Sequence, residues 1–248
     1  MIKIKTKEEI EIMAQAGKIL AGIMKEMIAM AKPGVATKDL DRAFESLVFS
    51  MGAEPSFKNF NGFPASVCLS INEELVHCIP SERRLKEGDI LSIDAGAHYK
   101  GYHSDMAVTV PIGKVDFEAM RLIKSTKKAL KRGIGKVRPG VTFGDIGNTI
   151  QRYAESQGLG IVRDLCGHGI GQNLHEEPEV SNYGKRGDGD EVKEGMVFCI
   201  EPMLTIGDWQ IKRAKDGYGY QTRDGSLSAH FEHTIAVTRN GAKVLTEI

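Results

Sequence analysis

The chain has 248 residues, of which 41% are hydrophobic and 27% charged, and this composition is typical of a globular protein that can bury polar groups in its core. Lysines and arginines (33) balance aspartates and glutamates (33), so the overall charge does not favour DNA or a membrane as partner. No apolar run of about 18 residues is present and the N-terminus is charged from Lys3, so we expect a cytoplasmic protein. The four cysteines form no CxxC pair, and we expect them to be reduced thiols.

The chain begins with two predicted helices. Apolar and small residues recur at helical spacing over 7–32, and Thr6 with Glu9 forms a predicted capping box at the start. Pro33-Gly34 ends this helix, and a second amphipathic helix is predicted over 38–51.

A weak internal repeat indicates two related halves. Pro33-Gly34-Val35 recurs 106 residues later as Pro139-Gly140-Val141, and each copy follows a long amphipathic helix and precedes a shorter one. We expect one catalytic domain over 1–248, with pseudo-repeat halves of about 1–113 and 114–248, because candidate ligands from both halves converge. Chance recurrence of a common Pro-Gly turn is the alternative.

In each half, short runs rich in Ile, Val and Thr follow the helices and read as strands. These runs are 66–71, 89–96, 102–110, 160–163, 196–205, 229–238 and 243–246. Helices followed by strands in each half predict an α+β fold, in which a curved, mainly antiparallel sheet carries the helices on its outer face.

Two aspartates lie on a predicted hairpin. Residues 91–108 read as two strands joined by a turn near Tyr99-Lys100, and a symmetric hairpin about that turn places Asp94 directly opposite Asp105. Their Cβ atoms would then be about 4.5 to 5.5 Å apart. Two carboxylates this close repel unless one is protonated or a cation lies between them. A bound metal ion is one explanation, and a solvated aspartate at a turn is the other.

Two glutamates interrupt apolar strands in the second half. Glu201 lies within 196–203 and Glu232 within 228–237. Burying an unpaired charge costs on the order of several kcal/mol, so a carboxylate inside a central strand needs a partner. A Lys or Arg from elsewhere in the fold is the alternative to a metal, although neither strand core contains a basic residue.

A histidine flanked by glycines completes the candidate set. His168 stands in the run 166–171, Cys-Gly-His-Gly-Ile-Gly, where glycines let the backbone pass close to a ligand. A glycine turn around a structural histidine is the alternative, and the spacing is not that of a dinucleotide-binding loop. His175-Glu-Glu-Pro178 is not a zinc-protease H-E-x-x-H motif, because residue 179 is Glu and Pro178 would break the required helix.

Four carboxylates and one imidazole form an oxygen-rich ligand set. Such a set suits two divalent ions, such as Mn²⁺, Fe²⁺, Co²⁺ or Zn²⁺, better than a closed structural zinc site. The five residues are Asp94, Asp105, His168, Glu201 and Glu232. We therefore predict a metal-dependent hydrolase.

The order of these ligands resembles that of the methionine aminopeptidases, with similarity over nearly the whole chain. The shared pattern is two aspartates eleven residues apart, a histidine in Gly-His-Gly, a Glu-Pro pair and a final Glu. The chain is similar to the short, bacterial type I form. The resemblance implies a duplicated pita-bread fold, a monomer, and removal of the initiator methionine from nascent proteins and peptides, with preference for a small second residue.

The resemblance also implies individual roles for the ligands. Asp94 would chelate one metal, and Asp105 and Glu232 would bridge both. His168 and Glu201 would complete the second metal site, and the two cations would activate a water molecule for attack on the peptide carbonyl. Glu201 would move a proton from that water toward the leaving amine.

Further residues of the active site follow from the same resemblance. His175 would help to stabilise the tetrahedral oxyanion and His77 would lie near the scissile amide, with a structural role as the alternative for each. The methionine pocket would be formed by Phe57, Phe60, Phe63, Cys68, Leu174 and Tyr218. Aromatic edges and soft neighbours suit a thioether, although core packing would also explain such residues.

Four pocket positions depart from the commonest family pattern. Phe60 and Phe63 stand where tyrosines are frequent, Leu174 where Phe is frequent, and Tyr218 where Trp is frequent. These changes keep the pocket largely apolar and leave open its shape and the size limit on the second substrate residue.

Two additional contacts are hypotheses. The family's alkali-ion site would place one Na⁺ or K⁺ near Asn72 and Ser228. The segment from Arg121 to Arg138 contains eight basic residues and no acid, so it could make a transient contact with ribosomal RNA. A solvated helix face is the alternative for this segment.

Two competing functions remain open at this point. A proline-specific aminopeptidase or dipeptidase shares the fold and the ligand order, but such relatives usually carry a large additional N-terminal domain. A non-catalytic binding module is the alternative from another class, and it would be expected to lose ligands, whereas all five are present.

Overall fold

The computed structural model describes residues 1–248 and contains four α-helices, one large sheet and two small sheets. The helices are α1 (Lys7–Met30), α2 (Thr37–Ser50), α3 (Phe117–Lys136) and α4 (Phe143–Ser156). A short 3₁₀ helix, η1 (Phe60–Gly62), lies between the first two strands of the large sheet. No helix combines the length and the apolar composition that crossing a membrane would require.

The helix boundaries follow local sequence signals. Thr6 and Glu9 form the predicted capping box at the start of α1, and Thr142 with Asp145 forms a second one at α4. Helix α1 ends two residues earlier than predicted, because Pro33 disfavours the helical conformation at the residue before it.

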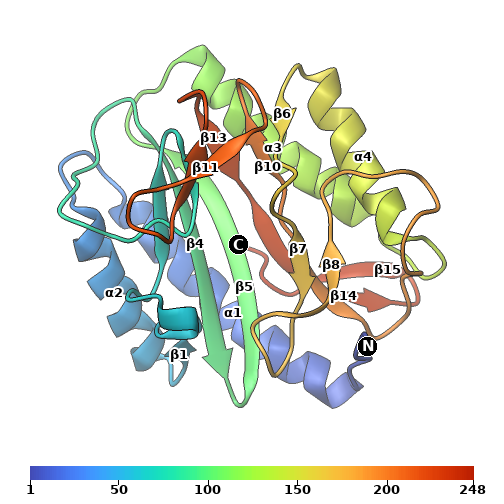
Figure 1. The fold of residues 1–248 in the computed structure, drawn as a ribbon. Helices are drawn as coiled ribbons and strands as arrows, with labels where there is room; N and C mark the ends of the chain where they lie inside the picture. The colour runs from blue at the N-terminus through green and yellow to red at the C-terminus, as the bar shows by residue number, and fades with distance from the viewer.

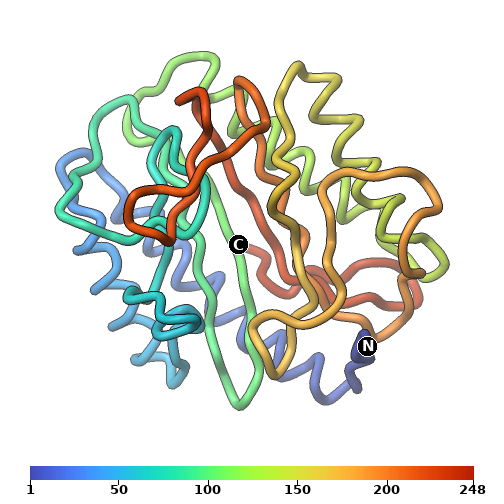
Figure 2. The backbone as a smooth tube through the Cα atoms, in the orientation of Figure 1, coloured from blue at the N-terminus to red at the C-terminus, as the bar shows by residue number.

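The large sheet has nine strands, and every pairing within it is antiparallel. Its strands are β1 (Glu54–Pro55), β2 (Cys68–Ile71), β4 (Ile90–Tyr99), β5 (Tyr102–Pro111), β7 (Gly167–Gly169), β8 (Glu176–Val180), β9 (Val197–Ile200), β14 (Glu232–Thr238) and β15 (Gly241–Val244). The order is β1-β4-β5-β14-β9-β7-β8, with β2 on β4 and β15 on β14. Figure 2 shows the β4–β5 hairpin beside the C-terminal strand β14 in the middle of the molecule, where the first and second halves of the chain meet.

The two small sheets account for most differences from the predicted strands. One contains β6 (Gly160–Ile161), β10 (Met203–Thr205) and β13 (Ser228–His230), and the other contains β3 (Glu74–Val76), β11 (Ile211–Arg213) and β12 (Tyr220–Thr222). The predicted strands 196–205 and 229–238 are each divided between two sheets. The first division falls at Pro202, which has no N–H to donate to a ladder.

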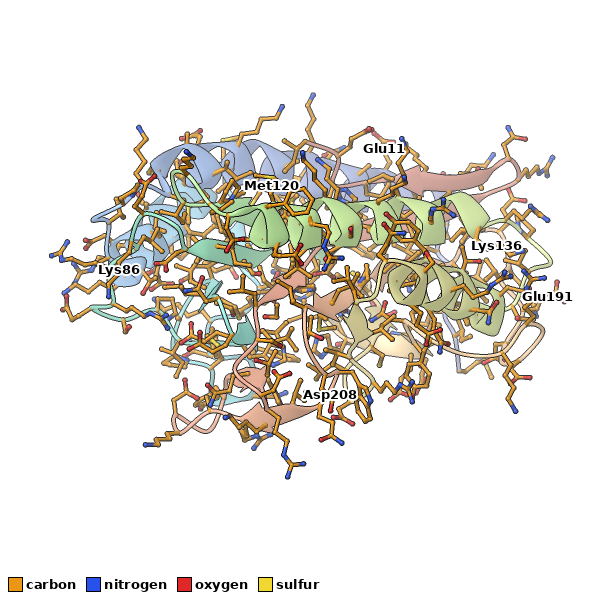
Figure 3. The ribbon with its side chains drawn as sticks, turned by 90° about the horizontal axis from the view of Figure 1, so that it is seen from above. Glu11, Lys86, Met120, Lys136, Glu191 and Asp208 are labelled. Carbon is orange, nitrogen blue, oxygen red and sulfur yellow. The ribbon has the colours of Figure 1, made fainter.

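The helices cover the outer face of the large sheet. Helix α1 packs on β4 and β5, while α3 packs on α4 and contacts β5, β9 and β15. Fully buried Leu20 and Met24 of α1 belong to the same core as Ile93 of β4 and Met106 of β5. Figures 1 and 3 show the helices on one side of the sheet, with the segment around Asp208 on the opposite side. The predicted α+β architecture is confirmed.

The register of the β4–β5 hairpin differs from the prediction. Asp94 pairs with Ala107 and Asp105 pairs with Gly96, so the two aspartates are diagonal neighbours rather than directly opposite. The turn is centred on Lys100 and Gly101, whose φ angles of 48° and 83° fit the tight hairpin turn that needs two left-handed residues. The pairing therefore shifts by two residues, and an even shift leaves both carboxylates on the same face.

Candidate active site

A cavity of about 910 Å³ is lined by every residue predicted to bind a divalent metal, to act in catalysis or to bind the substrate. All thirteen line this cavity. They are Phe57, Phe60, Phe63, Cys68, His77, Asp94, Asp105, His168, Leu174, His175, Glu201, Tyr218 and Glu232. Residues more than 170 positions apart in the sequence are thus brought to one site.

Neighbouring strands of the large sheet hold the four carboxylates. Asp94 lies on β4, Asp105 on β5 and Glu232 at the start of β14, which pairs with β5, while Glu201 directly follows β9. All four side chains are almost fully buried: the exposed fraction is 7% for Asp94, 3% for Asp105, 2% for Glu232 and 9% for Glu201. Antiparallel pairing of these strands therefore concentrates four buried acids at the centre of the sheet.

The carboxylates have no basic side chain to neutralise them. Their only ion-pair partners within 4.0 Å are histidines, and no Lys or Arg pairs with any of them. Asp94 Oδ1, Asp105 Oδ1 and Glu232 Oε1 are buried and have no hydrogen-bond partner. One carboxylate oxygen from each of these three residues lies within 4.8 Å of the others, so the site has the donor set and the spacing to hold a divalent cation.

The pKa values of the four acids are raised, because burial and mutual repulsion disfavour the charged carboxylates. Burial raises the pKa of Asp94 to about 6, with the neighbouring His230 acting in the opposite direction. Burial also raises the pKa of Asp105, Glu201 and Glu232 well above the ordinary range, and repulsion from the other carboxylates adds to the effect. The cluster therefore needs either protons or cations.

His168 presents a nitrogen lone pair to this cluster. Its Nδ1–H donates to the Gly169 carbonyl at 2.9 Å, which leaves Nε2 as the unprotonated nitrogen of the neutral ring. Nε2 lies 3.7 Å from Glu201 Oε1 and 3.9 Å from Asp105 Oδ2. Burial lowers the pKa of His168 to about 3, so the ring is neutral and suited to metal ligation at physiological pH.

Two further histidines face the same cavity. The ring of His175 lies 4.2 Å from that of His168 and 5.1 Å from that of Phe60, measured between centroids. His77 follows β3 with a left-handed φ of 57°, and its ring lies 6.1 Å from that of Tyr220. Burial lowers the pKa of His77 to about 4 and also lowers that of His175, so both are neutral hydrogen-bonding groups at the cavity wall.

The apolar side of the cavity adjoins the carboxylates. Phe57, Phe63, Cys68 and Leu174 are buried in one cluster, against which Phe60 and Tyr218 pack. Cys68 pairs directly with Asp94 across β2 and β4, so the pocket begins one strand away from the acids. The Tyr218 hydroxyl donates to the Gly62 carbonyl at 2.8 Å, which anchors the exposed rim.

Two residues that the sequence did not predict contact the acids. His230 is 1% exposed and its Nε2 lies 3.6 Å from Glu201 Oε2 and 4.0 Å from Glu232 Oε2. Thr234 Oγ1 accepts from the Asp105 N–H at 2.9 Å and donates to the Asp105 carbonyl at 2.7 Å. Both lie two residues from Glu232, so alternation along a strand could have flagged them.

The residues of the hypothetical alkali-ion site are adjacent. The backbone N–H of Ser228 donates to the Asn72 carbonyl at 2.9 Å, and its hydroxyl lies 3.2 Å from that carbonyl and 2.9 Å from the Glu74 carbonyl. Asn72 adopts a left-handed φ of 61°, which turns its carbonyl toward Ser228.

Comparisons with known proteins identify the family of the chain. Metallopeptidase family M24 matches residues 11–239. A methionine aminopeptidase of Clostridium acetobutylicum is 49% identical over 247 residues, 99% of each chain. The crystal structure of a methionine aminopeptidase from Rickettsia prowazekii superimposes with a TM-score of 0.98 at 42% identity, covering all of both chains.

Proline-specific relatives share the fold at a greater distance. The prolidase from Pyrococcus furiosus has a TM-score of 0.81 and 28% identity, and the match covers 99% of this chain but 65% of the prolidase. The similarity to both groups confirms the pita-bread fold. Since the methionine aminopeptidases match with higher identity over their whole length, the chain belongs to metallopeptidase family M24 and, within it, to the methionine aminopeptidases.

Proposed function

We propose that this enzyme removes the initiator methionine from nascent proteins and peptides in the cytoplasm, acts as a monomer, and prefers a small second residue. One observation supports this most strongly: four buried carboxylates and a neutral imidazole lie beside an apolar pocket in a single cavity. The acids suit a hydrolytic metal centre, and the pocket suits a thioether side chain.

In this proposal, five residues hold two divalent cations, which could be Co²⁺, Mn²⁺, Fe²⁺ or Zn²⁺. Asp94 would hold one, Asp105 and Glu232 would contribute to both, and His168 and Glu201 would complete the other. When bound, the cations supply positive charge that lowers the pKa of a water molecule and polarises the scissile carbonyl. The unpartnered buried oxygens of Asp94, Asp105 and Glu232 support the assignment.

The protein side chains then orient the substrate and move protons. Glu201 takes a proton from the attacking water and delivers it to the leaving amine. His175 donates a hydrogen bond to the developing oxyanion, and His77 contacts the scissile amide. Phe63 and Leu174 belong to the apolar cluster beside the acids that receives the methionine side chain and excludes water around it.

The test is release of methionine from Met-Ala-Ser. Protein freed of metal with a chelator should be inactive and should recover on addition of Mn²⁺ or Co²⁺, while Glu201→Gln should lose activity under all conditions. Lack of methionine release after either metal is added would contradict the proposal. Faster cleavage of an X-Pro peptide than of Met-Ala-Ser would favour the proline-specific alternative.

A bound alkali ion is a further part of the proposal. One Na⁺ or K⁺ would lie near Asn72 and Ser228, where the left-handed turn at Asn72 and the Glu74 carbonyl supply backbone oxygens. Unfolding temperatures measured in K⁺, Na⁺ and tetramethylammonium salts at equal ionic strength would test this. Equal values in all three salts would argue against it.

The basic face of α3 supports a transient contact with the ribosome. Lys124, Lys127, Lys128, Lys131 and Arg132 are exposed, and the only ion pair on this helix joins Arg121 to Glu118. Binding to ribosomal RNA should weaken steeply with salt. Co-sedimentation with ribosomes should be lost when Lys127 and Lys131 are changed to Glu, and co-sedimentation that survives this reversal would argue against the contact.

A further inference from the structure

His230 is a buried histidine beside the candidate acids that has no role in the proposed mechanism. It lies at the end of β13, two residues before Glu232, and it is 1% exposed. Neither ring nitrogen has a hydrogen-bond partner. An imidazole buried without a partner is unfavourable, because it has lost its hydration without replacement.

The backbone aims this imidazole at Glu201. The His230 N–H donates to Thr109 Oγ1 and the His230 carbonyl accepts from the same hydroxyl, both at 2.8 Å. Pairing with Met203 fixes the other edge of the residue. The backbone of His230 is therefore held on both edges, and its ring Nε2 lies 3.6 Å from Glu201 Oε2, closer than to Glu232 Oε2 at 4.0 Å.

Glu201 lies between two imidazoles, one at each oxygen. Oε1 is 3.7 Å from His168 Nε2, and Oε2 is 3.6 Å from His230 Nε2. The carboxylate accepts no hydrogen bond, and only its backbone carbonyl is held, by Asn182 Nδ2 at 3.1 Å. His168 and Glu201 line the cavity but His230 does not, so His230 contacts the carboxylate from behind.

We propose that His230 is a positioning residue for Glu201, donating its Nε2–H to Oε2 and leaving Oε1 free for the cation beside His168. The present separation exceeds a hydrogen bond by about half an ångström, which a small rotation of the carboxylate closes. Ligating carboxylates commonly have such an outer partner, which fixes their orientation. This inference rests on the proposed metal centre.

Three variants test the assignment. His230→Gln keeps a donor of similar reach, and His230→Leu keeps the bulk without a donor. His233→Leu is the matched control, because His233 is adjacent to Glu232 in the chain but pairs with Thr246 Oγ1 at 3.0 Å instead of the acids. Thermal unfolding of the metal-free proteins shows whether each variant folds.

Mn²⁺ affinity of the chelator-treated proteins is the main measurement. His230→Leu should bind Mn²⁺ about 10 to 100-fold more weakly than wild type, the range typical of an outer-shell partner. His230→Gln and His233→Leu should retain most of the affinity. For Met-Ala-Ser, His230→Leu should lower kcat more than it raises KM, since the pocket is intact.

Pulsed electron paramagnetic resonance of the Mn²⁺-loaded proteins separates positioning from ligation. Nitrogen coupling from one imidazole should persist in every His230 variant and disappear only in His168→Gln. Wild-type affinity in His230→Leu, equal weakening in His230→Gln and His230→Leu, or loss of a second nitrogen coupling in His230→Leu would each overturn the proposal. Failure of wild type to bind Mn²⁺ would instead overturn the metal centre itself, and the positioning role with it.

Discussion

Replacing Asp94 with Asn should change how the stability of the metal-free protein depends on pH. Burial raises the pKa of Asp94 from the 3.8 of an exposed aspartate to about 6. The folded state therefore binds this proton more tightly than the unfolded state. The contribution of this proton to the unfolding free energy is fully present below about pH 4 and is lost as the pH rises through about 6.

The magnitude follows from the shift. A tenfold change in proton affinity corresponds to about 1.4 kcal/mol, so the Asp94 carboxyl accounts for a loss of about 3 kcal/mol across this window. Other groups act in the opposite direction, since burial lowers the pKa of His77 and His103 to about 4. These histidines are present in both proteins, so their contribution cancels in the difference between wild type and Asp94→Asn. The difference then measures the aspartate together with its repulsion of the neighbouring acids.

The assay is urea unfolding of protein freed of metal, near pH 4 and near pH 7, followed by circular dichroism and by fluorescence of the single tryptophan, Trp209. Between the two conditions, the unfolding free energy of wild type should fall by about 2 to 3 kcal/mol relative to that of Asp94→Asn. Identical pH dependence in the two proteins would refute the argument that burial of this carboxylate is costly without a cation.

Three further outcomes are expected. Gly17→Ala should destabilise the protein by about 3 kcal/mol in urea unfolding, because a Cβ there would lie 2.1 Å from the Leu245 carbonyl oxygen. Gly22→Ala on the same helix meets no atom within 4 Å and should stabilise the protein by about 0.5 to 1 kcal/mol. Equal effects of the two substitutions would contradict the steric argument. Lys5→Met should cost about 2 kcal/mol in urea unfolding. Lys5 Nζ pairs with Glu176 at 2.8 Å, and Lys3 Nζ remains 3.5 Å from the same carboxylate in the variant. Adding Glu176→Gln should recover much of that loss in a double-mutant cycle, and simple additivity would show that Lys5 and Glu176 are uncoupled. Adding Mn²⁺ at about 100 times its dissociation constant should raise the unfolding free energy of metal-free wild type by about 2.7 kcal/mol, and an unchanged melting temperature in differential scanning calorimetry would argue against a metal centre.

Local sequence rules were sufficient for the helices and for the identity of the candidate acids. Helix α1 begins at its capping box and ends before Pro33, because both signals act within a few residues. Glu201 and Glu232 stood out because each interrupts an apolar strand with no basic residue beside it. The family resemblance, and not spacing alone, supplied the pocket residues and the roles of His77 and His175.

Short strands and hairpin register were beyond these rules. The six strands that were not predicted have two to five residues each and are stabilised by pairing with distant segments. The offset between Asp94 and Asp105 depended on whether the turn was centred on Tyr99-Lys100 or Lys100-Gly101. Alternation still placed both acids on one face, because the error was an even number of residues.

The sequence by itself determined which side chains could hold a metal, since a buried carboxylate without a basic neighbour requires a cation or a proton. Only the tertiary structure decided how these side chains meet. Pairing of β5 with β14 brings together Asp105 and Glu232, which are 127 residues apart. Only the fold, too, placed His230 behind Glu201, because contacts between remote segments depend on packing of the whole sheet and not on local pattern.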